Sequence, residues 1–327
     1  MNQPANPTKL RWGIIGAGNI ATHAIAPAIH ASANGTLYGV ASRTKEKAEA
    51  LAHQLQAQKS FPNYQALLDC SEVDAVYIGL PNGLHEDWVI RAAEAGKHVL
   101  CEKSLALSYS AAQRMNNACN LAGVLLMEAY MYRHHPQWNR VHEILNSGII
   151  GEIQTITAHL GGALQNQQDH RWSGEIGGGA LYDVTCYAIN AARYILKEEP
   201  TTVQAIGKLR EPGADESTHV ILEFPNGKLA SAQGTLTGHH AQGVRIIGTT
   251  GVLHVERPFV CNTEETHLHI TTKQGKQQIT IPGANQFMLE VEHFADCILN
   301  GCRLKYPAEN GNLNTKVCEL AAKALRS

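Results

Sequence analysis

A tight glycine turn near the start of the chain restricts the possible fold more than any other feature. The stretch from Gly13 to Ala21 reads GIIGAGNIA. An apolar run enters the turn and a helix-compatible segment leaves it, as in a βα unit that presents backbone N–H groups to a pyrophosphate. Gly16 allows the turn, Gly18 lets a phosphate approach the backbone, and Ala21 keeps the helix close to the strand. The pattern G-x-G-x-x-A therefore predicts dinucleotide binding, with an ordinary strand-turn-helix junction as the structural alternative.

Apolar strand patterns alternate with helical patterns up to about residue 127. Short connections between them predict a parallel doubly wound sheet. After residue 128, two helical stretches lead into a series of β-like runs, and two further helices close the chain. We therefore expect an α/β fold of two domains. Residues 1–127 would form a Rossmann domain, and residues 128–327 an α+β domain with an open, mostly antiparallel sheet.

Composition argues against several classes of function. The formal net charge of −2 over 327 residues gives no basic footprint for nucleic acid. No apolar segment approaches the length of a membrane span, and the N-terminus lacks the order of a signal peptide. The eight cysteines form no C-x-x-C motif and no Cys/His spacing typical of zinc. We expect a cytoplasmic protein with reduced thiols, no metal, and no nucleic-acid or membrane partner.

The residues after the expected strands are candidates for ligand contacts, because doubly wound sheets bind ligands at the carboxyl ends of their strands. The second strand ends at Ser42-Arg43, where NAD-binding domains usually carry an acid for the ribose diol. A hydroxyl and a guanidinium accept a 2′-phosphate, so the sequence favours NADP over NAD. The alternative for Arg43 is a solvated residue at a helix start. Lys103 ends an interior strand and is expected to point into the cofactor cleft, with a solvent-facing lysine as its alternative.

The segment that contains this lysine is similar to a known family signature. Residues 95–103 read AGKHVLCEK and resemble the A-G-K-H-V-x-x-E-K-P motif of the glucose-fructose oxidoreductase, inositol dehydrogenase and MocA family. Further similar stretches extend along nearly the whole chain: PNGLH at 81–85, MEAYMYR at 127–133, GGGALYDVTCY at 177–187, and GTTG at 248–251 with Pro258-Phe259. The pattern is most similar to the dihydrodiol dehydrogenase and aldose (xylose) dehydrogenase branch.

This resemblance implies hydride transfer between a nicotinamide cofactor and a hydroxyl or carbonyl group of a sugar, polyol or dihydrodiol. Tyr187 would exchange a proton with the substrate oxygen. A free phenol has a pKa of about 10, and a Lys103 ammonium nearby would lower it. Asp183 lies four residues before Tyr187, so the two share a helical face, and it would orient a second hydroxyl or the lysine. A half-buried helix tyrosine without a catalytic role is the alternative for Tyr187.

The resemblance also assigns binding roles. Contacts to the cofactor are expected from Gly16, Gly18, Asn19, Ile20, Ser42, Arg43, Pro81, Asn82, His85, Glu102 and Lys103. Arg171 and Trp172 are expected to line the substrate pocket, with a loop salt bridge and a packing anchor as their alternatives. Two positions depart from the family pattern, since Ser104 stands where proline is usual and Thr185 where glycine is usual.

Two other functions occur among proteins of this kind. An NAD-dependent glycosidase would use redox chemistry transiently and release a sugar without net NADPH, and a regulator would bind the dinucleotide without turnover. A homodimer or homotetramer through the open sheet face is implied by the resemblance alone. The substrate itself is not identified by the sequence.

Overall fold

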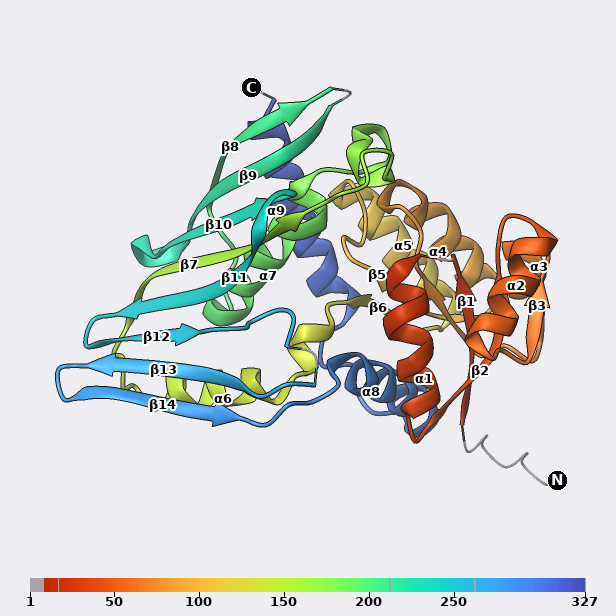
Figure 1. The fold of residues 1–327 in the computed structure, drawn as a ribbon, viewed down its shortest axis with the longest axis horizontal. Helices are drawn as coiled ribbons and strands as arrows, with labels where there is room; N and C mark the ends of the chain where they lie inside the picture. The colour runs from red at the N-terminus through yellow and green to blue at the C-terminus, as the bar shows by residue number, and fades with distance from the viewer. Residues whose placement is uncertain (1–8, 17, 212, 262, 327) are drawn as a thin grey trace. The chain divides into compact units, whose positions relative to one another are not determined.

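The computed structural model describes residues 9–16, 18–211, 213–261 and 263–326 (Figure 1). Contacts divide the chain into two compact units. Unit 1 comprises the chain up to Ala106 together with Ser110–Met131 and Phe287–Asn312, and unit 2 comprises Leu107–Tyr109, Tyr132–Gln286 and Leu313–Ser327. The expected second domain includes residues 287–312, whereas the contacts place them in unit 1.

Unit 1 is built on a six-stranded parallel sheet in the order β3-β2-β1-β4-β5-β6. The strands are β1 (Leu10–Ile15), β2 (Gly35–Ala41), β3 (Lys59–Phe61), β4 (Ala75–Ile78), β5 (His98–Glu102) and β6 (Leu126–Ala129). The chain order reverses between β1 and β4, which is the switch point at which such sheets bind ligands. The expected doubly wound sheet is confirmed.

Helices cover both faces of this sheet, so its strands are apolar on both sides. They are α1 (Ala26–Ala31), α2 (Lys45–Leu55), α3 (Tyr64–Leu68), α4 (His85–Glu94), α5 (Tyr109–Ala122) and α8 (Gln286–Asn300). One buried cluster joins α1, α2 and α8 to the face that carries Ile14, Tyr77 and Leu100. A second cluster joins α3, α4 and α5 to the opposite face. Helix α8 belongs to unit 1 because Val291 and Phe294 are fully buried in the first cluster.

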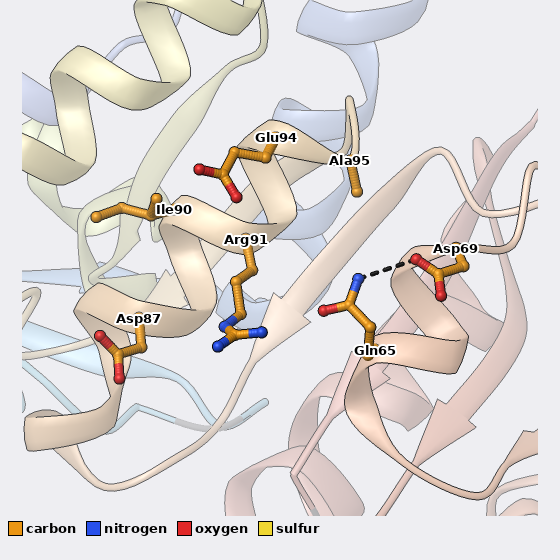
Figure 2. Close-up of a pocket in the computed structure, with 7 residues that line it drawn as sticks. All are labelled: Gln65, Asp69, Asp87, Ile90, Arg91, Glu94 and Ala95. Atoms are coloured by element: carbon orange, nitrogen blue, oxygen red, sulfur yellow. Dashed lines mark hydrogen bonds between the residues drawn. The ribbon is translucent and has the colours of Figure 1, made fainter.

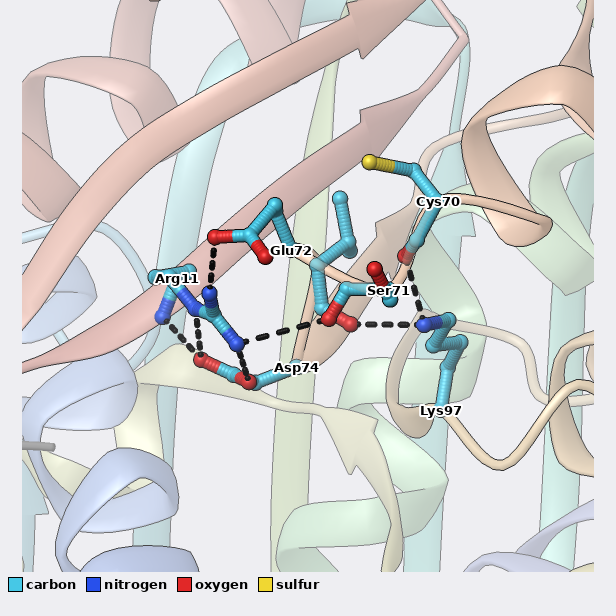
Figure 3. Close-up of polar contacts among 7 residues, drawn as sticks. Arg11, Cys70, Ser71, Glu72, Asp74 and Lys97 are labelled. Atoms are coloured by element: carbon cyan, nitrogen blue, oxygen red, sulfur yellow. Dashed lines mark hydrogen bonds and ion pairs between the residues drawn. The ribbon is translucent and has the colours of Figure 1, made fainter. Parts of the chain in front are cut away.

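The amino ends of the strands are held by a polar network (Figure 3). The Arg11 side chain donates to both oxygens of Asp74, at 2.9 and 2.8 Å, and to Glu72 at 2.5 Å. The Lys97 ammonium, which is buried, donates to the carbonyl oxygens of Cys70 and Val73, both at 2.7 Å. These contacts fasten the starts of β1 and β5 to the loop that enters β4.

Unit 2 contains an eight-stranded sheet in the order β14-β13-β12-β11-β7-β10-β9-β8. The strands are β7 (Ile153–Ala163), β8 (Thr202–Arg210), β9 (Ala214–Glu223), β10 (Leu229–Thr235), β11 (Thr237–Gly248), β12 (Gly251–Val255), β13 (Thr266–Thr272) and β14 (Gly275–Ile281). Among the strand pairings of the described residues in this sheet, only that of β10 with β7 is parallel, so the expectation of a mostly antiparallel sheet is confirmed.

Helix α7 (Cys186–Leu196) contacts β7 and β10 in the middle of this sheet. It is buried along nearly its whole length, which anchors the segment that precedes it. The remaining helices are α6 (Pro136–Asn146) and α9 (Ala308–Ala324), which begins in unit 1 and ends in unit 2. Among the described residues, no helix has both the length and the apolar character that a bilayer crossing requires.

Candidate active site

The glycine turn after β1 packs against the chain after β4 so closely that a side chain at Gly16 would clash, and we call this contact the cradle. Gly16 has a φ of +99°, and a Cβ at this position would lie 2.5 Å from the carbonyl oxygen of Gly79, which follows β4. A Cβ at Gly18 would lie 3.6 Å from the same oxygen. Asn19 and Ile20 after the turn are exposed. The turn therefore fits the close approach of a dinucleotide phosphate, and Ala17 lies outside the described residues.

The end of β2 carries one buried and one exposed polar residue. Ser42 is buried and Arg43 is exposed, while the Thr44 hydroxyl accepts from the Lys47 N–H and caps α2. Burial raises the pKa of the half-buried Tyr64 phenol, and the charge of Arg43 opposes this shift. The guanidinium thus lies within electrostatic range of the residue that begins α3. A cation and a hydroxyl stand at the edge where the adenosine half of a dinucleotide binds in Rossmann domains.

His85 joins two loops at the carboxyl edge of the sheet. Its Nδ1 lies 3.0 Å from the Ser104 carbonyl oxygen and 3.2 Å from that of Leu105, and its Nε2 lies 2.8 Å from that of Leu80. The ring is fully buried, and burial lowers its pKa. Both ring nitrogens therefore face backbone carbonyls of the chain. This position supports a role in fixing the loops, and the expected direct contact with cofactor stays a prediction.

The loop after β5 is held by two carboxylates. The Tyr77 hydroxyl donates to Glu102 at 2.6 Å, and Glu102 accepts from the Lys103 backbone N–H at 3.2 Å. Glu128, at the end of β6, accepts from the Leu105 N–H at 2.8 Å. Lys103 is half-buried, and its peptide bond to Ser104 is cis. Pro81 and Asn82, also half-buried, lie in the segment that follows the neighbouring strand β4.

In unit 2, Asp183 is paired with Arg171. The Arg171 Nε lies 3.3 Å from Asp183, and one of its terminal nitrogens lies 3.5 Å from Asp169. The Gly179 N–H donates to the Arg171 carbonyl at 2.7 Å, and Gly179 has a φ of +104°. A Cβ at Gly178 would overlap that carbonyl. The triple glycine thus lets the loop before it pack tightly against the start of the helix that carries Asp183.

The helix that carries Asp183 and Tyr187 begins with a π-helical turn over Leu181–Thr185 and continues as α7. Such turns occur frequently at functional sites. Its first N–H, from Leu181, donates to the buried Asp215 at 2.7 Å, and burial raises the pKa of that carboxyl. Thr185 is buried against β10, where a Cβ on Gly234 would overlap its hydroxyl. Gly234 on the strand therefore provides the space that a glycine on the helix would otherwise give.

Aromatic rings surround Tyr187, which is buried. Its ring centroid lies 6.0 Å from that of Tyr132 and 5.6 Å from that of Phe259. Trp172 is also buried, but its Nε1 donates to the Asn166 carbonyl at 3.1 Å and its ring lies under the guanidinium of Arg210. This packing supports an anchoring role for Trp172, and its contact with substrate stays a prediction.

Sequence reasoning did not single out Asp215 and Glu290, which belong to no motif, and it gave no site role to Glu128, which lies in the MEAYMYR stretch. It also missed a group formed by His293, Cys297 and Cys302, whose ligand atoms all lie within 4.8 Å of one another. The His293 Nε2 accepts from the Lys305 N–H at 3.0 Å, which occupies a lone pair that a metal would need. We assign no metal to this group.

A hollow of about 600 Å³ lies between α3 and α4 (Figure 2). It is lined by Gln65, Asp69, Asp87, Ile90, Arg91, Glu94 and Ala95, and Gln65 donates to Asp69 at 2.9 Å. None of the expected cofactor or substrate residues lines it. Its three carboxylates against one guanidinium would repel phosphates, so the glycine turn remains the candidate cofactor site.

Comparison with known proteins identifies the family. Residues 10–130 match a family model described as oxidoreductase family, NAD-binding Rossmann fold, and residues 138–254 match the GFO/IDH/MocA C-terminal domain. The chain belongs to the GFO/IDH/MocA family. The expected family and the expected enzyme class, an NAD(P)-dependent oxidoreductase, are confirmed.

Several relatives of this family member act on sugars. A D-xylose 1-dehydrogenase (NADP(+)) of Haloferax volcanii is 34% identical, covering 89% of this chain and 90% of the relative. A dTDP-3,4-didehydro-2,6-dideoxy-alpha-D-glucose 3-reductase of Actinomadura kijaniata is 33% identical, covering 92% and 91%. A 3-ketoreductase from the same organism, solved in complex with NADP and TDP-benzene, has a TM-score of 0.91 at 30% identity, covering 97% of each chain.

Proposed function

We propose that this family member is an NADP-dependent oxidoreductase that transfers a hydride between nicotinamide and a hydroxyl or carbonyl carbon of a sugar, polyol or dihydrodiol. The observation that carries the proposal is the Gly16–Gly79 cradle at the switch point of the parallel sheet. The names of its relatives favour a sugar, because the Haloferax enzyme is a xylose dehydrogenase and the Actinomadura enzyme reduces a sugar ketone.

The cofactor would be held along the carboxyl edge of the sheet. Backbone groups of Gly16, Gly18, Asn19 and Ile20 would bind the pyrophosphate, because backbone N–H groups at the start of a helix favour phosphate oxygens. Ser42 and Arg43 would bind the 2′-phosphate that distinguishes NADP from NAD. Pro81, Asn82, Glu102 and Lys103 would flank the nicotinamide half.

When bound, the cofactor would supply or accept the hydride. Tyr187 would donate its phenolic proton to the substrate oxygen in reduction and take it back in oxidation. The proposal requires Lys103 and Tyr187 to reach one substrate, where the ammonium would favour the phenolate. Asp183, oriented by Arg171, would accept a hydrogen bond from a neighbouring hydroxyl, which gives Arg171 an indirect part in binding.

Replacement of Tyr187 by phenylalanine tests the mechanism. Removal of a general acid-base group should lower kcat by about a hundredfold to ten-thousandfold, while NADPH affinity changes little. Tyr109→Phe is a control, since Tyr109 is also a helical tyrosine of unit 2, although it is half-buried where Tyr187 is buried, and this variant should leave kcat unchanged. A Tyr187→Phe enzyme with the wild-type kcat would remove Tyr187 from the mechanism.

A substrate panel tests the reaction class. NADP and NAD would be crossed with aldoses, inositols and trans-dihydrodiols while the absorbance of reduced nicotinamide is followed. Net reduction of NADP with an aldose or polyol is the expected result. Sugar release from a glycoside without net NADPH would indicate the glycosidase instead, and no turnover with any member would indicate the regulator.

A further inference from the structure

A buried acid lies on the helix that covers the sheet behind the proposed nicotinamide site. Glu290 is in α8, and its side chain is 0% exposed. Within the described ranges, neither of its carboxyl oxygens receives a hydrogen bond. An ionised carboxylate that is removed from water without a donor or a cation is strongly unfavourable, whereas a neutral carboxylic acid is much less so.

Two neighbouring strands place polar groups on the face that α8 covers. Tyr77 on β4 is in register with Leu100 on β5, and both belong to the cluster that contains the α8 residues Val291 and Phe294. Glu102 follows Leu100 by two residues, so its side chain lies on the same face of the sheet. The Tyr77 hydroxyl donates to Glu102 at 2.6 Å.

The electrostatics join Glu290 to this pair. Burial raises the pKa of Glu290 well above its usual range, and the charge of Glu102 raises it further. Burial also raises the pKa of the Tyr77 phenol well above its usual range, and Glu102 and Glu290 both add to that shift. The groups that face Glu290 from β4 and β5 are therefore a neutral phenol and a carboxylate.

We propose that Glu290 is a neutral carboxylic acid that donates its O–H to the Glu102 carboxylate. Glu102 would then accept from Glu290 of α8 in addition to Tyr77 of β4 and the Lys103 N–H. Glu290 is thereby a positioning residue, because Glu102 holds the backbone at Lys103. The positioning role rests on the proposed function of Lys103, whereas the protonation of Glu290 does not.

This protonation makes folding depend on pH in a defined direction. An unfolded glutamate has a pKa of about 4.3, and the folded pKa is raised above it. Between these two values the unfolded chain has lost the proton and the folded chain keeps it. The contribution of Glu290 to stability is complete below the unfolded pKa and is lost as the pH rises toward the folded pKa. One proton changes the unfolding equilibrium constant by about tenfold per pH unit.

The first experiment compares denaturant unfolding of the full chain, without cofactor, for wild type, Glu290→Gln and Glu94→Gln from about pH 5 to about pH 8. Glutamine keeps the shape and the donor of the protonated acid but does not titrate. The wild-type unfolding constant should rise with pH about tenfold per unit more steeply than that of Glu290→Gln. Glu94 is an exposed helical glutamate, and its variant should follow the wild type. Parallel profiles for wild type and Glu290→Gln would overturn the protonation of Glu290.

If Glu290→Gln fails to fold, infrared spectroscopy of the wild type can detect the protonated glutamate directly. Uniform ¹³C labelling of glutamate should shift a carbonyl stretch of a protonated carboxylic acid at neutral pH. Aspartate labelling should leave that band in place, which separates it from the buried Asp215. The absence of a glutamate-sensitive band would overturn the proposal.

The positioning role is tested by a variant without a donor. Glu290→Leu should lower kcat by about tenfold, the effect of removing one hydrogen bond from a buried network, and Glu290→Gln should restore it. The pH profile of Lys103 labelling by an amine reagent should not differ between wild type and Glu290→Gln, because neither side chain carries a charge. A wild-type kcat in Glu290→Leu, or a shifted labelling profile in Glu290→Gln, would overturn the role. If only Tyr187→Phe behaves contrary to expectation, the proposed function fails and the protonated Glu290 stands.

Discussion

The two ends of the six-stranded sheet use polar groups in opposite ways. At the amino end, Arg11 is paired with Asp74 and Glu72, and Lys97 donates to two backbone carbonyls. At the carboxyl end, Gly16 packs closely against the Gly79 carbonyl, while Gly18 and Arg43 are exposed. Charge therefore does not distinguish a binding edge from a structural one. The difference is whether the fold supplies partners for a charged side chain or leaves that side chain exposed to solvent.

The largest expected effect comes from filling the cradle at the carboxyl end. In Gly16→Ala, the new Cβ would lie 2.5 Å from the Gly79 carbonyl at a φ of +99°. The turn must shift, and with it the N–H groups proposed to hold the pyrophosphate. We expect the Kd for NADPH, measured by fluorescence titration, to rise by about a hundredfold or more, since backbone strain of about 1–3 kcal/mol adds to the clash.

Gly123→Ala is a control in the same unit that introduces backbone strain without a steric clash. Gly123 has a φ of +69°, yet a Cβ there would meet nothing within 4 Å. This variant should lose about 1 kcal/mol of unfolding free energy and keep its NADPH affinity. If Gly16→Ala bound NADPH as tightly as Gly123→Ala does, the glycine turn at the carboxyl end of the sheet would not be the cofactor site.

The next effect concerns cofactor choice. In Arg43→Asp, a cation proposed to bind the 2′-phosphate is replaced by an anion that repels it. The Kd for NADPH should rise by about tenfold to a hundredfold, the effect of losing a charge-assisted hydrogen bond, while the Kd for NADH changes little. Lys45→Asp is the control, because it makes the same change of charge at an exposed position two residues further along the chain. It shows how much of the effect comes from the overall change in charge near the start of the helix. A wild type that prefers NADH would show that the end of β2 does not select NADP.

Local patterns were sufficient for the parts of the fold that neighbouring residues determine. The glycine turn, the alternation that gives the parallel sheet and the family motif could all be predicted from short stretches. The assignment of α8 could not, because an apolar helix face shows that a helix is buried but not on which sheet. Val291 and Phe294 pack with Trp12 and Tyr77, which are more than 200 residues earlier in the chain.

The contacts of the candidate site residues also depend on distant parts of the chain, which local sequence patterns do not show. His85 lies in a motif beside the expected nicotinamide, yet both of its ring nitrogens face carbonyls of the chain. Glu290 looks like an ordinary polar residue of an amphipathic helix, and only the fold brings it within electrostatic range of Glu102. A sequence shows which residue types can carry out a reaction. It does not show which of them already have hydrogen-bond partners within the folded chain.

The smallest expected effect tests the amino end. Lys97 belongs to the family signature AGKHV, but it lies at the end of the sheet opposite to the proposed cofactor site. Lys97→Met keeps the apolar stem and removes the donor to the carbonyls of Cys70 and Val73. Unfolding in denaturant should show a loss of about 1–3 kcal/mol, because the Val73 carbonyl loses its Lys97 donor and the Cys70 carbonyl keeps only the Val73 N–H, while the Kd for NADPH and kcat stay unchanged. Lys47→Met, at an exposed helix position, should change neither quantity. A tenfold change in the Kd for NADPH in Lys97→Met would mean that the two ends of the sheet are coupled and that the signature lysine contributes to binding through the strands.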